Sequence, residues 1–381
     1  MRFIHLSDLH IGKSVNGFSM LEEQRHAFNQ ILGYIESKKA EAVIIAGDVY
    51  DRAVPGVEAV KLFDFLLTEL DKLNVTTLIV AGNHDSPERL NFARQLLSLR
   101  GIHIYGEFDG TLHSVTLQDE YGDVCFWLMP FIKPASVDGF FPEMEINSYD
   151  DAASVVLNAA EKDLNIRNVL ISHQFYTPPG VPLIRCESEI NLIGGLDAID
   201  AGILKGFDYV ALGHLHRSQK TGSETIRYAG SPVKYSFSEW RYEKSALLID
   251  LREKGDITIE ALPLKPMHDM REIKGKLDEL INSDNVDQTN REDYLHVILT
   301  DEDELIDPMG KIRSVYPNVM SLDFENARTS IDLATITSEP DASVALSAFD
   351  LFSQFFLETQ GSVMSEEQAN IVKDLLEVDM R

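Results

Sequence analysis

Short apolar runs alternate with amphipathic stretches along the first hundred residues. Apolar runs that stop at glycine or at polar residues predict buried strands at residues 2–7, 42–46 and 78–81. Apolar side chains at helical spacing follow each run and predict helices at residues 21–38, 57–73 and 88–99. The second helix should face inward through Val60, Phe63, Leu67 and Leu70. The repeated strand–helix unit predicts a parallel sheet layered with helices, which is an α/β fold.

The pattern changes after residue 100. Short strands are predicted at residues 115–117, 124–129, 168–172, 207–212, 225–229, 245–251 and 257–262, with one helix at 150–164. The segment between the strands at 168–172 and 207–212 contains Pro178-Pro179-Gly180 and Gly194-Gly195. Irregular segments of this length are uncommon in compact domains and are often functional, so we expect this loop to contribute to a site.

Pro263 and Pro266 indicate a domain boundary. Beyond it, the pattern predicts a small α/β unit made of a helix at 270–282, a strand at 294–299, a helix at 309–315 and a strand at 319–324. Residues 327–342 lack a clear period and are predicted to be a linker. Two amphipathic helices should follow, the second beginning with the capping-box pair Ser365 and Gln368. The predicted domains are therefore 1–263, 264–326, 327–342 and 343–381.

Composition narrows the class of protein. The 381 residues are 44% apolar, and two cysteines are too few for a disulfide framework or a thiolate metal site. The first residues are too short and polar for a signal peptide, and no apolar run has membrane-spanning length, so we expect a soluble cytoplasmic protein. The net charge of −28 argues against binding nucleic acid by bulk electrostatics. Bound metal ions could make the electrostatic potential of a site positive, or a partner protein could supply the affinity for nucleic acid.

Five predicted strands end in residues of the kind that bind metals. These residues are Asp8, His10, Asp48, Asn83, His84, His173, His214 and His216. A polar residue after one strand is usually a turn former or helix cap, but independent turns would not repeatedly use Asp, Asn and His. Carboxyl ends of parallel strands share one edge of a sheet, so we expect these side chains to meet there. Oxygen and imidazole ligands without thiolate suit manganese, iron or zinc, and a shared carboxylate bridges two ions ~3.5–4 Å apart.

The same residues carry a family resemblance that covers essentially the whole chain. The segments Asp8-x-His10, Gly47-Asp48-x-x-Asp51-Arg52, Gly82-Asn83-His84-Asp85, Ser172-His173 and Gly213-His214-x-His216 resemble, in order, the motifs of the calcineurin-like metallophosphoesterases. Tyr228-Ala229-Gly230-Ser231-Pro232 and Ser236-Phe237-Ser238-Glu239 are similar to segments of the SbcD-type nuclease subunits. Those are the bacterial relatives of the eukaryotic double-strand-break repair nuclease. The resemblance implies a four-layer α/β/β/α sandwich with a small capping domain.

The resemblance also implies roles for individual residues. Asp8, His10 and His216 would hold one ion, Asn83, His173 and His214 a second, and Asp48 would bridge them. Both ions are usually manganese in this family. His84 would face the phosphate, either stabilising charge in the transition state or protonating the leaving oxygen, and Asp51 or Asp85 could set its tautomer. His5 alternates with apolar residues and is expected to be a core histidine.

The family further implies a substrate and partners. We expect a manganese-dependent DNA nuclease of repair and recombination, cutting duplex ends as an exonuclease and single strands or hairpins as an endonuclease. The capping domain would position DNA, the terminal helices would dock on the coiled coil of an SbcC-type ATPase, and the chain would form a homodimer associated with the nucleoid. A phosphomonoesterase or cyclic-nucleotide phosphodiesterase with the same metal site is the alternative. A catalytically inactive scaffold is disfavoured by the complete ligand set.

Overall fold

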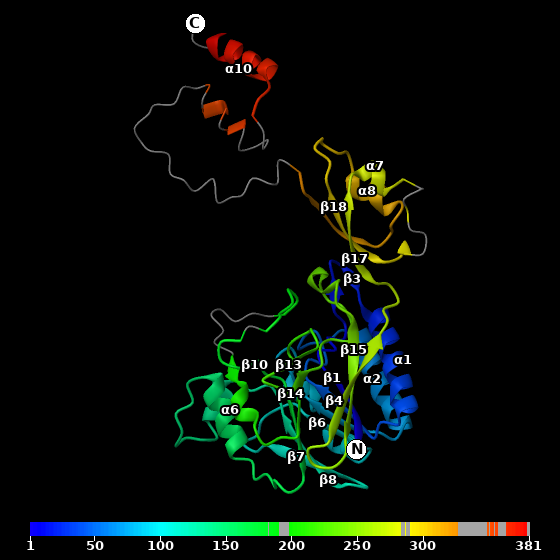
Figure 1. Ribbon diagram of the computed structural model, residues 1–381, viewed down its shortest axis with the longest axis vertical. Coiled ribbons are helices and arrows are strands. Elements are labelled where there is room, and N and C mark those ends of the chain that lie inside the picture. The colour runs from blue at the N-terminus through cyan, green and yellow to red at the C-terminus, as the bar shows by residue number, and fades with distance from the viewer. Residues whose placement is uncertain are drawn as a thin grey trace. The chain divides into compact units, whose positions relative to one another are not determined.

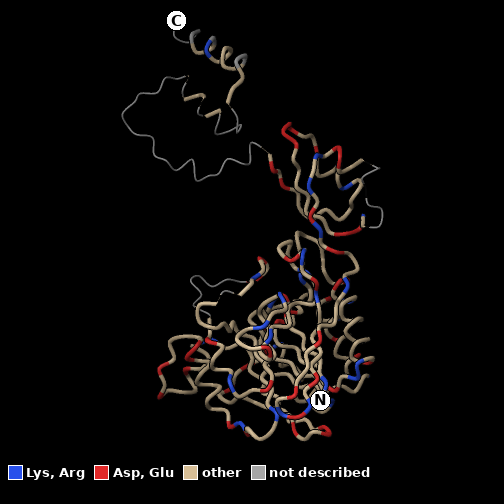
Figure 2. Tube along the Cα trace, viewed as in Figure 1, with Lys and Arg blue, Asp and Glu red and all other residues tan. Residues whose placement is uncertain are grey.

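The computed structural model describes residues 1–181, 183–189, 198–282, 286, 290–326, 349, 351–353, 355–356 and 363–378. The predicted linker at 327–342 lies outside the described residues. The chain divides into two compact units, Met1–Met267 and His268–Arg381. Acidic residues occur throughout both units, with Lys and Arg interspersed (Figure 2).

A six-stranded sheet forms the first half of the first unit. Its order is β16 (Ile257–Leu264), β15 (Lys244–Leu251), β1 (Arg2–Leu6), β4 (Ala42–Ala46), β5 (Thr76–Val80) and β6 (Ile102–Tyr105). The pairs from β1 to β6 are parallel, whereas β15 and β16 are added antiparallel. The parallel pairs are connected by α1 (Leu21–Lys38), α2 (Val57–Lys72) and two short helices, α3 (Pro87–Leu90) and α4 (Arg94–Ser98). This part is the strand–helix repeat that the sequence predicts.

A second six-stranded sheet faces the first. Its order is β13 (Gln219–Thr221), β14 (Ser223–Tyr228), β12 (Tyr209–Leu212), β9 (Arg167–Ser172), β8 (Gly122–Met129) and β7 (His113–Asp119). The four central strands are parallel and the two outer ones are antiparallel to their neighbours. Helices α5 (Pro134–Asp138) and α6 (Tyr149–Asn158) belong to this half. Shorter elements are β2 (Ser14–Val15), β3 (Phe18–Ser19), β10 (Tyr176–Thr177), β11 (Ile199–Asp200) and the 3₁₀ turns Ala201–Leu204 and Phe237–Glu239.

The two sheets pack face to face through a continuous apolar core. Phe3 of the first sheet makes edge-to-face contacts with Phe126 and Tyr209 of the second, at centroid separations of 5.5 and 5.8 Å. Helices α1 and α2 cover the outer face of the first sheet, and α6 covers that of the second (Figure 1). The layers are therefore α/β/β/α, which confirms the expected sandwich. His5 is fully buried and its Nδ1 lies 2.9 Å from the Tyr209 hydroxyl, as expected of a core histidine.

The second unit contains a small three-stranded parallel sheet. Its order is β17 (Met270–Gly275), β18 (Tyr294–Leu299) and β19 (Val319–Phe324), with α7 (Leu277–Leu280) and α8 (Pro308–Arg313) as connections. Residues Phe349, Leu351–Ser353, Phe355 and Phe356 are helical, and α10 (Glu366–Val378) follows. The Ser365 hydroxyl accepts the Gln368 N–H and the Gln368 side chain accepts the Ser365 N–H, so the capping box is confirmed.

Three local predictions were wrong. The helix predicted at 270–282 is instead β17 followed by the single turn α7, because residues 270–275 pair in parallel with β18. The helix predicted at 88–99 breaks into α3 and α4 at Ala93, whose φ is 59°. On α2, Val60 is 45% exposed, because the buried stripe runs through Ala59, Leu62, Phe63, Leu66 and Leu70. That helix offers two overlapping apolar stripes, and packing against the sheet selects one.

Cys125 and Cys186 are both buried free thiols. Within the part of the chain that the structure describes, no helix combines the length and the apolar character needed to cross a bilayer.

A buried ion pair ties the second sheet together. The Arg167 guanidinium, 3% exposed, donates to both carboxylate oxygens of Asp119 at 3.0 and 2.5 Å. It also donates to the carbonyls of Leu251, Arg252 and Gly122 at 2.9, 2.7 and 2.7 Å. One side chain thus links β7, β8 and β9 to the end of β15.

Replacing Arg167 with Met should lower the free energy of unfolding by about 2–4 kcal/mol, because the Arg252 and Gly122 carbonyls would lose a buried donor and Asp119 would lose the bidentate guanidinium while keeping the N-terminal ammonium. Denaturant titration followed by circular dichroism measures this change. Arg2→Met is the matched control, since Arg2 is half-exposed and lies 3.4 Å from Asp250, so about 0–1 kcal/mol is expected. A similar, small loss for both variants would contradict the structural role of Arg167.

Candidate metal centre

Loops from both sheets converge at one end of the sandwich. Asp8 and His10 follow β1, Asp48 follows β4, Asn83 and His84 follow β5, His173 follows β9, and His214 and His216 follow β12. All eight residues predicted from strand ends meet there. The prediction that they share the edge of one sheet was wrong, because the strands belong to two sheets whose carboxyl ends lie together. The Nδ1 of His173 lies 2.7 Å from the Ala46 carbonyl oxygen and joins the two edges.

One group of donor atoms comprises Asp8, His10 and His216, whose ligand atoms lie within 4.8 Å of one another. The Nε2 atoms of His10 and His216 are 3.0 Å apart. All three side chains are almost completely buried. The Asp8 carboxylate is oriented by the His214 backbone N–H, which donates to it at 2.9 Å, and by the Ser7 hydroxyl at 2.5 Å.

A second group surrounds the side-chain oxygen of Asn83. This Oδ1 atom lies 3.1 Å from His173 Nε2 and 3.0 Å from His214 Nδ1. Asn83 and His214 are half-buried, so this group is accessible to solvent on one side. Burial lowers the pKa of His214 to about 3, with His173 adding to the effect. Its imidazole is therefore neutral at neutral pH, which is the form that binds metal ions.

Asp48 lies between the two groups. One carboxylate oxygen is 3.5 Å from His10 Nε2 and 3.3 Å from His173 Nε2, while the other accepts the His84 backbone N–H at 2.9 Å. Burial alone would raise the pKa of Asp48, but His173 and His10 hold it well below its usual range. Asp48 in turn raises the pKa of His173 to about 9 against the effect of burial. A divalent cation bound to both side chains would replace the stabilisation that each gives the charged form of the other.

The backbone at these positions is strained. Asp8, His10, Asp48 and His214 have φ values of 52°, 42°, 50° and 99°, in the left-handed region that non-glycine residues rarely adopt. Each such residue costs about 1–3 kcal/mol, and such strain concentrates at functional sites. Hydrogen bonds from Asp8 N to Gly47 O at 3.1 Å and from His10 N to Asp48 O at 2.9 Å hold the loops in place.

Glycines allow the loops to approach each other closely. At Gly82 a Cβ atom would overlap the Asp48 carboxylate and backbone nitrogen, and at Gly47 it would overlap the His173 ring. The φ of Gly82 does not lie in the left-handed region, unlike that of Gly47 at 87°, so Gly82 is required for space rather than for backbone conformation.

Hydrogen bonds fix the tautomers of two histidines. The Nδ1 of His173 can only donate to the carbonyl of Ala46, which leaves Nε2 as the site-facing atom. The Ser188 hydroxyl donates to the Glu239 carboxylate at 3.0 Å, so it must accept from His216 Nδ1 at 2.7 Å. The lone pair of His216 is therefore on Nε2, directed at His10.

This second layer of residues was not predicted. Glu239 is buried and forms a short ion pair with Lys244, which also donates to the His216 carbonyl at 2.8 Å. Glu189 accepts the His216 N–H at 2.7 Å. Two sequence signals pointed here without assigning roles: Glu239 ends the Ser236-Phe237-Ser238-Glu239 segment, and Ser188 and Glu189 lie in the long loop expected to be functional.

The surroundings of His84 differ from the expectation. Its Nδ1 lies 3.0 Å from the backbone carbonyl of Asp51, so a main-chain oxygen sets the tautomer instead of a carboxylate. The Asp51 carboxylate instead binds Lys13 at 2.8 Å and lies 3.7 Å from His10 Nδ1. Asp85 accepts the N–H groups of Val49, Tyr50 and Gly82 at 3.1, 2.9 and 2.9 Å. It therefore fastens the loop after β5 to the loop after β4.

The donor set fits a pair of divalent cations. Two buried carboxylates and several imidazoles converge without thiolates, and the Nε2 atom of His216 faces another imidazole nitrogen 3.0 Å away. A cation between these nitrogens and the carboxylates would compensate a cluster that is otherwise costly to bury.

An α/β/β/α sandwich with this donor set at its strand ends defines a metal-dependent phosphoesterase. The chain belongs to the calcineurin-like phosphoesterase family, whose model matches residues 1–218. Residues 266–360 match the SbcD C-terminal family, described as the type 5 capsule protein repressor C-terminal domain. The resemblance stated from the motifs is thus confirmed.

Similar individual proteins include one curated relative over nearly the full length. The chain is 28% identical over 382 residues to the SbcD subunit of the nuclease SbcCD from Staphylococcus epidermidis, covering 99% of this chain and 98% of the relative. Among solved structures, a dimetal phosphatase from Danio rerio is 11% identical with a TM-score of 0.42, covering 70% of this chain and 97% of its own. GAP50, the anchor in the inner membrane complex of Plasmodium, is 12% identical with a TM-score of 0.43, covering 91% and 99%.

Replacing Ser188 with Ala should weaken binding of Mn²⁺ about 10–100-fold, because His216 would lose the acceptor that fixes its tautomer. Isothermal titration calorimetry of the metal-free protein measures this affinity. Ser37→Ala is the control, since among the described residues that hydroxyl bonds only to the Tyr34 carbonyl of its own helix. Equal affinity of the Ser188 variant and the wild type would refute the role of Ser188.

Replacing Gly82 with Ala should abolish tight binding of one or both ions, because the added methyl group would displace Asp48. Metal content after dialysis, measured by inductively coupled plasma mass spectrometry, should fall below that of the wild type. Gly33→Ala in α1 is the control, because nothing lies within 4 Å of its added Cβ. Wild-type metal content in the Gly82 variant would show that the loop has room to adjust.

Proposed function

We propose that this chain is the nuclease component of an SbcCD-type complex and hydrolyses DNA phosphodiester bonds with two manganese ions. The observation that carries the proposal is the position of the buried Asp48 carboxylate, 3.3 and 3.5 Å from imidazoles supplied by opposite sheets. Such a shared carboxylate suits a two-metal centre for phosphoryl chemistry. DNA as substrate is supported by the similarity, over nearly the full chain, to the SbcD subunit of a nuclease SbcCD.

The two donor groups support a division of ligands. Asp8, His10 and His216 would hold the first ion, Asn83, His173 and His214 the second, and Asp48 both. Bound divalent ions supply Lewis-acid activation of a phosphate and of a water molecule. The chain's part is to hold the ligands in fixed positions, through the Ala46 carbonyl for His173 and Ser188 for His216.

His84 would act on the phosphate without binding metal. Its ring contacts that of His10 edge-on, with centroids 4.7 Å apart, and the side chain is half-buried. Because Nδ1 donates to the Asp51 carbonyl, the proton exchanged with the substrate would be carried on Nε2. Nε2 could stabilise developing charge or protonate the leaving oxygen. Asp51 and Asp85 would support this role indirectly, by positioning the loops.

The second unit would connect catalysis to DNA and to an ATPase partner. We assign residues 264–326 to positioning DNA. Two basic residues of this segment, Arg271 and Lys274, form ion pairs with Asp293 and Glu325. The terminal helices would dock on the coiled coil of an SbcC-type ATPase. Ile371 and Leu375 of α10 are 54% and 63% exposed, as expected for a helix that lies in a partner's groove. ATP turnover there would drive exonuclease action on duplex ends in the cytoplasm.

A homodimer is supported by apolar side chains exposed on the first unit. They are Val54, Val57 and Val60 at the start of α2, and Phe92, Leu96 and Leu99 around α4. These helices lead into the neighbouring strands β5 and β6. Exposed apolar side chains grouped on a surface commonly mark a protein interface.

The function is tested with purified protein, Mn²⁺, linear duplex DNA, single-stranded DNA, a chromogenic phosphodiester and a phosphomonoester. Replacing His84 with Ala should reduce DNA cleavage about 10²–10⁴-fold with Mn²⁺ content unchanged, because a proton-transfer group would be lost and no ligand removed. Gel assays measure cleavage, and plasma mass spectrometry measures the metal.

His26→Ala, on α1, is the matched control and should cleave DNA like the wild type. Unchanged cleavage by the His84 variant would overturn its assigned role. Hydrolysis of the phosphomonoester alone by the wild type would instead favour a phosphatase over a nuclease.

A further inference from the structure

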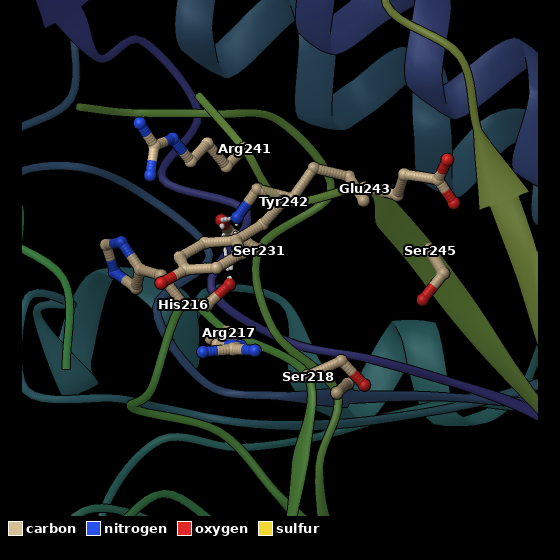
Figure 3. A pocket seen from close by; sticks show the side chains of 10 residues that line it. His216, Arg217, Ser218, Ser231, Arg241, Tyr242, Glu243 and Ser245 are labelled. Atoms are coloured by element: carbon tan, nitrogen blue, oxygen red, sulfur yellow. Dashed lines mark hydrogen bonds between the residues drawn. The ribbon is translucent and has the colours of Figure 1, made fainter. Parts of the chain in front are cut away.

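A cavity of about 330 Å³ opens beside the metal centre. Its lining includes His216, Arg217, Arg241, Tyr242, Glu243 and Lys244. We call it the Arg217 pocket; Figure 3 shows Arg217, Arg241 and His216 near the Tyr242 ring. The pocket is built from the segment after β12 and from the segment that leads into β15.

Two guanidinium groups on this pocket have no carboxylate partner among the residues that the structure describes. Arg217 stacks on the Tyr242 ring, with its Cζ 4.1 Å from the ring centroid, and Arg241 stacks on Trp240 at 4.6 Å. In a chain of net charge −28, whose acidic residues are spread along the trace (Figure 2), two neighbouring cations would readily find carboxylates. Stacking instead holds Arg217 in place while its N–H groups stay available.

The other charged residues of the pocket do not cancel these two. Lys244 is buried in its ion pair with Glu239, so that pair is neutral overall. The Glu243 carboxylate is exposed and points away from Arg217 and Arg241 (Figure 3). The pocket therefore presents positive charge with several N–H donors, a combination that suits a phosphate group.

The pocket and the metal centre share His216. Its Nε2 atom lies 3.0 Å from His10 in the first donor group, and the residue also forms part of the pocket lining. The two sites thus adjoin each other at His216. A nucleic-acid strand with one phosphate at the metals would bring a neighbouring phosphate close to this pocket.

We propose that the Arg217 pocket is a phosphate-binding subsite for the strand being cut, in which Arg217 and Arg241 bind a phosphodiester next to the scissile one. This inference rests on the proposed nuclease function. It adds that, when the scissile phosphate lies at the metal centre, a neighbouring phosphate of the same nucleic-acid strand lies in the Arg217 pocket. The pocket makes cleavage depend on a second phosphate, so the site would favour a polynucleotide over an ester that carries a single phosphate.

A scan of single methylphosphonate linkages tests the subsite, because each replacement removes the charge of one phosphate. The probe is a fluorescein-labelled ten-residue oligothymidylate bound to the full chain in Ca²⁺, with affinity measured by fluorescence anisotropy. For the wild type, one linkage adjacent to the cut position should weaken binding about tenfold when neutralised, the size of a charge-assisted hydrogen bond. In Arg217→Ala and Arg241→Ala, neutralising that linkage should change affinity less than about twofold.

Arg2→Ala is the matched control, since it removes one charge at the opposite end of β1 from Asp8 and should keep the tenfold effect. Arg241 is exposed, so its variant tests the subsite even if Arg217→Ala fails to fold. An equal effect at every linkage, or a tenfold effect that persists in both variants, would overturn the subsite while leaving the nuclease proposal standing. Failure of the wild type to bind or cut the unmodified oligonucleotide would overturn the nuclease proposal itself.

Discussion

The placement of one buried carboxylate, that of Asp48, governs the rest of the site. It follows β4 of the first sheet but lies 3.3 Å from His173, which follows β9 of the second. Burying a carboxylate in an apolar sandwich costs free energy unless the carboxylate is paired. The two sheets must therefore pack so that His173 of the second sheet, as well as His10 of the first, lies beside Asp48. This position of Asp48 requires a strained, left-handed backbone at the residue itself. It also requires glycine at positions 47 and 82, where a side chain would overlap His173 and Asp48. The large core between the sheets supplies the stability that offsets this strain.

A layer of hydrogen bonds holds the side chains at these positions in fixed orientations. Main-chain carbonyls orient His173 and His84, whereas His216 depends on the chain of Ser188, Glu239 and Lys244. The difference has a physical consequence. A carbonyl in a strand or tight loop moves only with the fold, but Ser188 belongs to a long loop. Of the imidazoles at the site, His216 is therefore the one whose orientation depends most on a segment outside the two sheets.

The order of strands and helices followed from local pattern, because burial imposes a period of two or 3.6 residues on each element. Helix α1 at Leu21–Lys38 has the predicted bounds. Local pattern failed where distant partners decided the outcome. Residues 270–275 form a strand because β18 pairs with them, and α2 buries Ala59 instead of Val60 because the sheet selects one of two apolar stripes. Sequence likewise could not say from pattern alone that two sheets, rather than one, would supply the strand ends.

At the site, the sequence by itself determined which residue types stand at the carboxyl ends of five strands, since apolar runs that stop at Asp, Asn and His mark those ends. Only the tertiary structure decided how they are used. Ser188 reaches His216 across 28 positions and Glu239 across 51, and no periodicity spans such separations. The partner of His84 is a main-chain oxygen, which carries no sequence signal. The sequence determines which residue types are present. Histidine tautomers, the position of Asp48 between imidazoles of both sheets, and the lining of the pocket are determined only when distant segments come into contact.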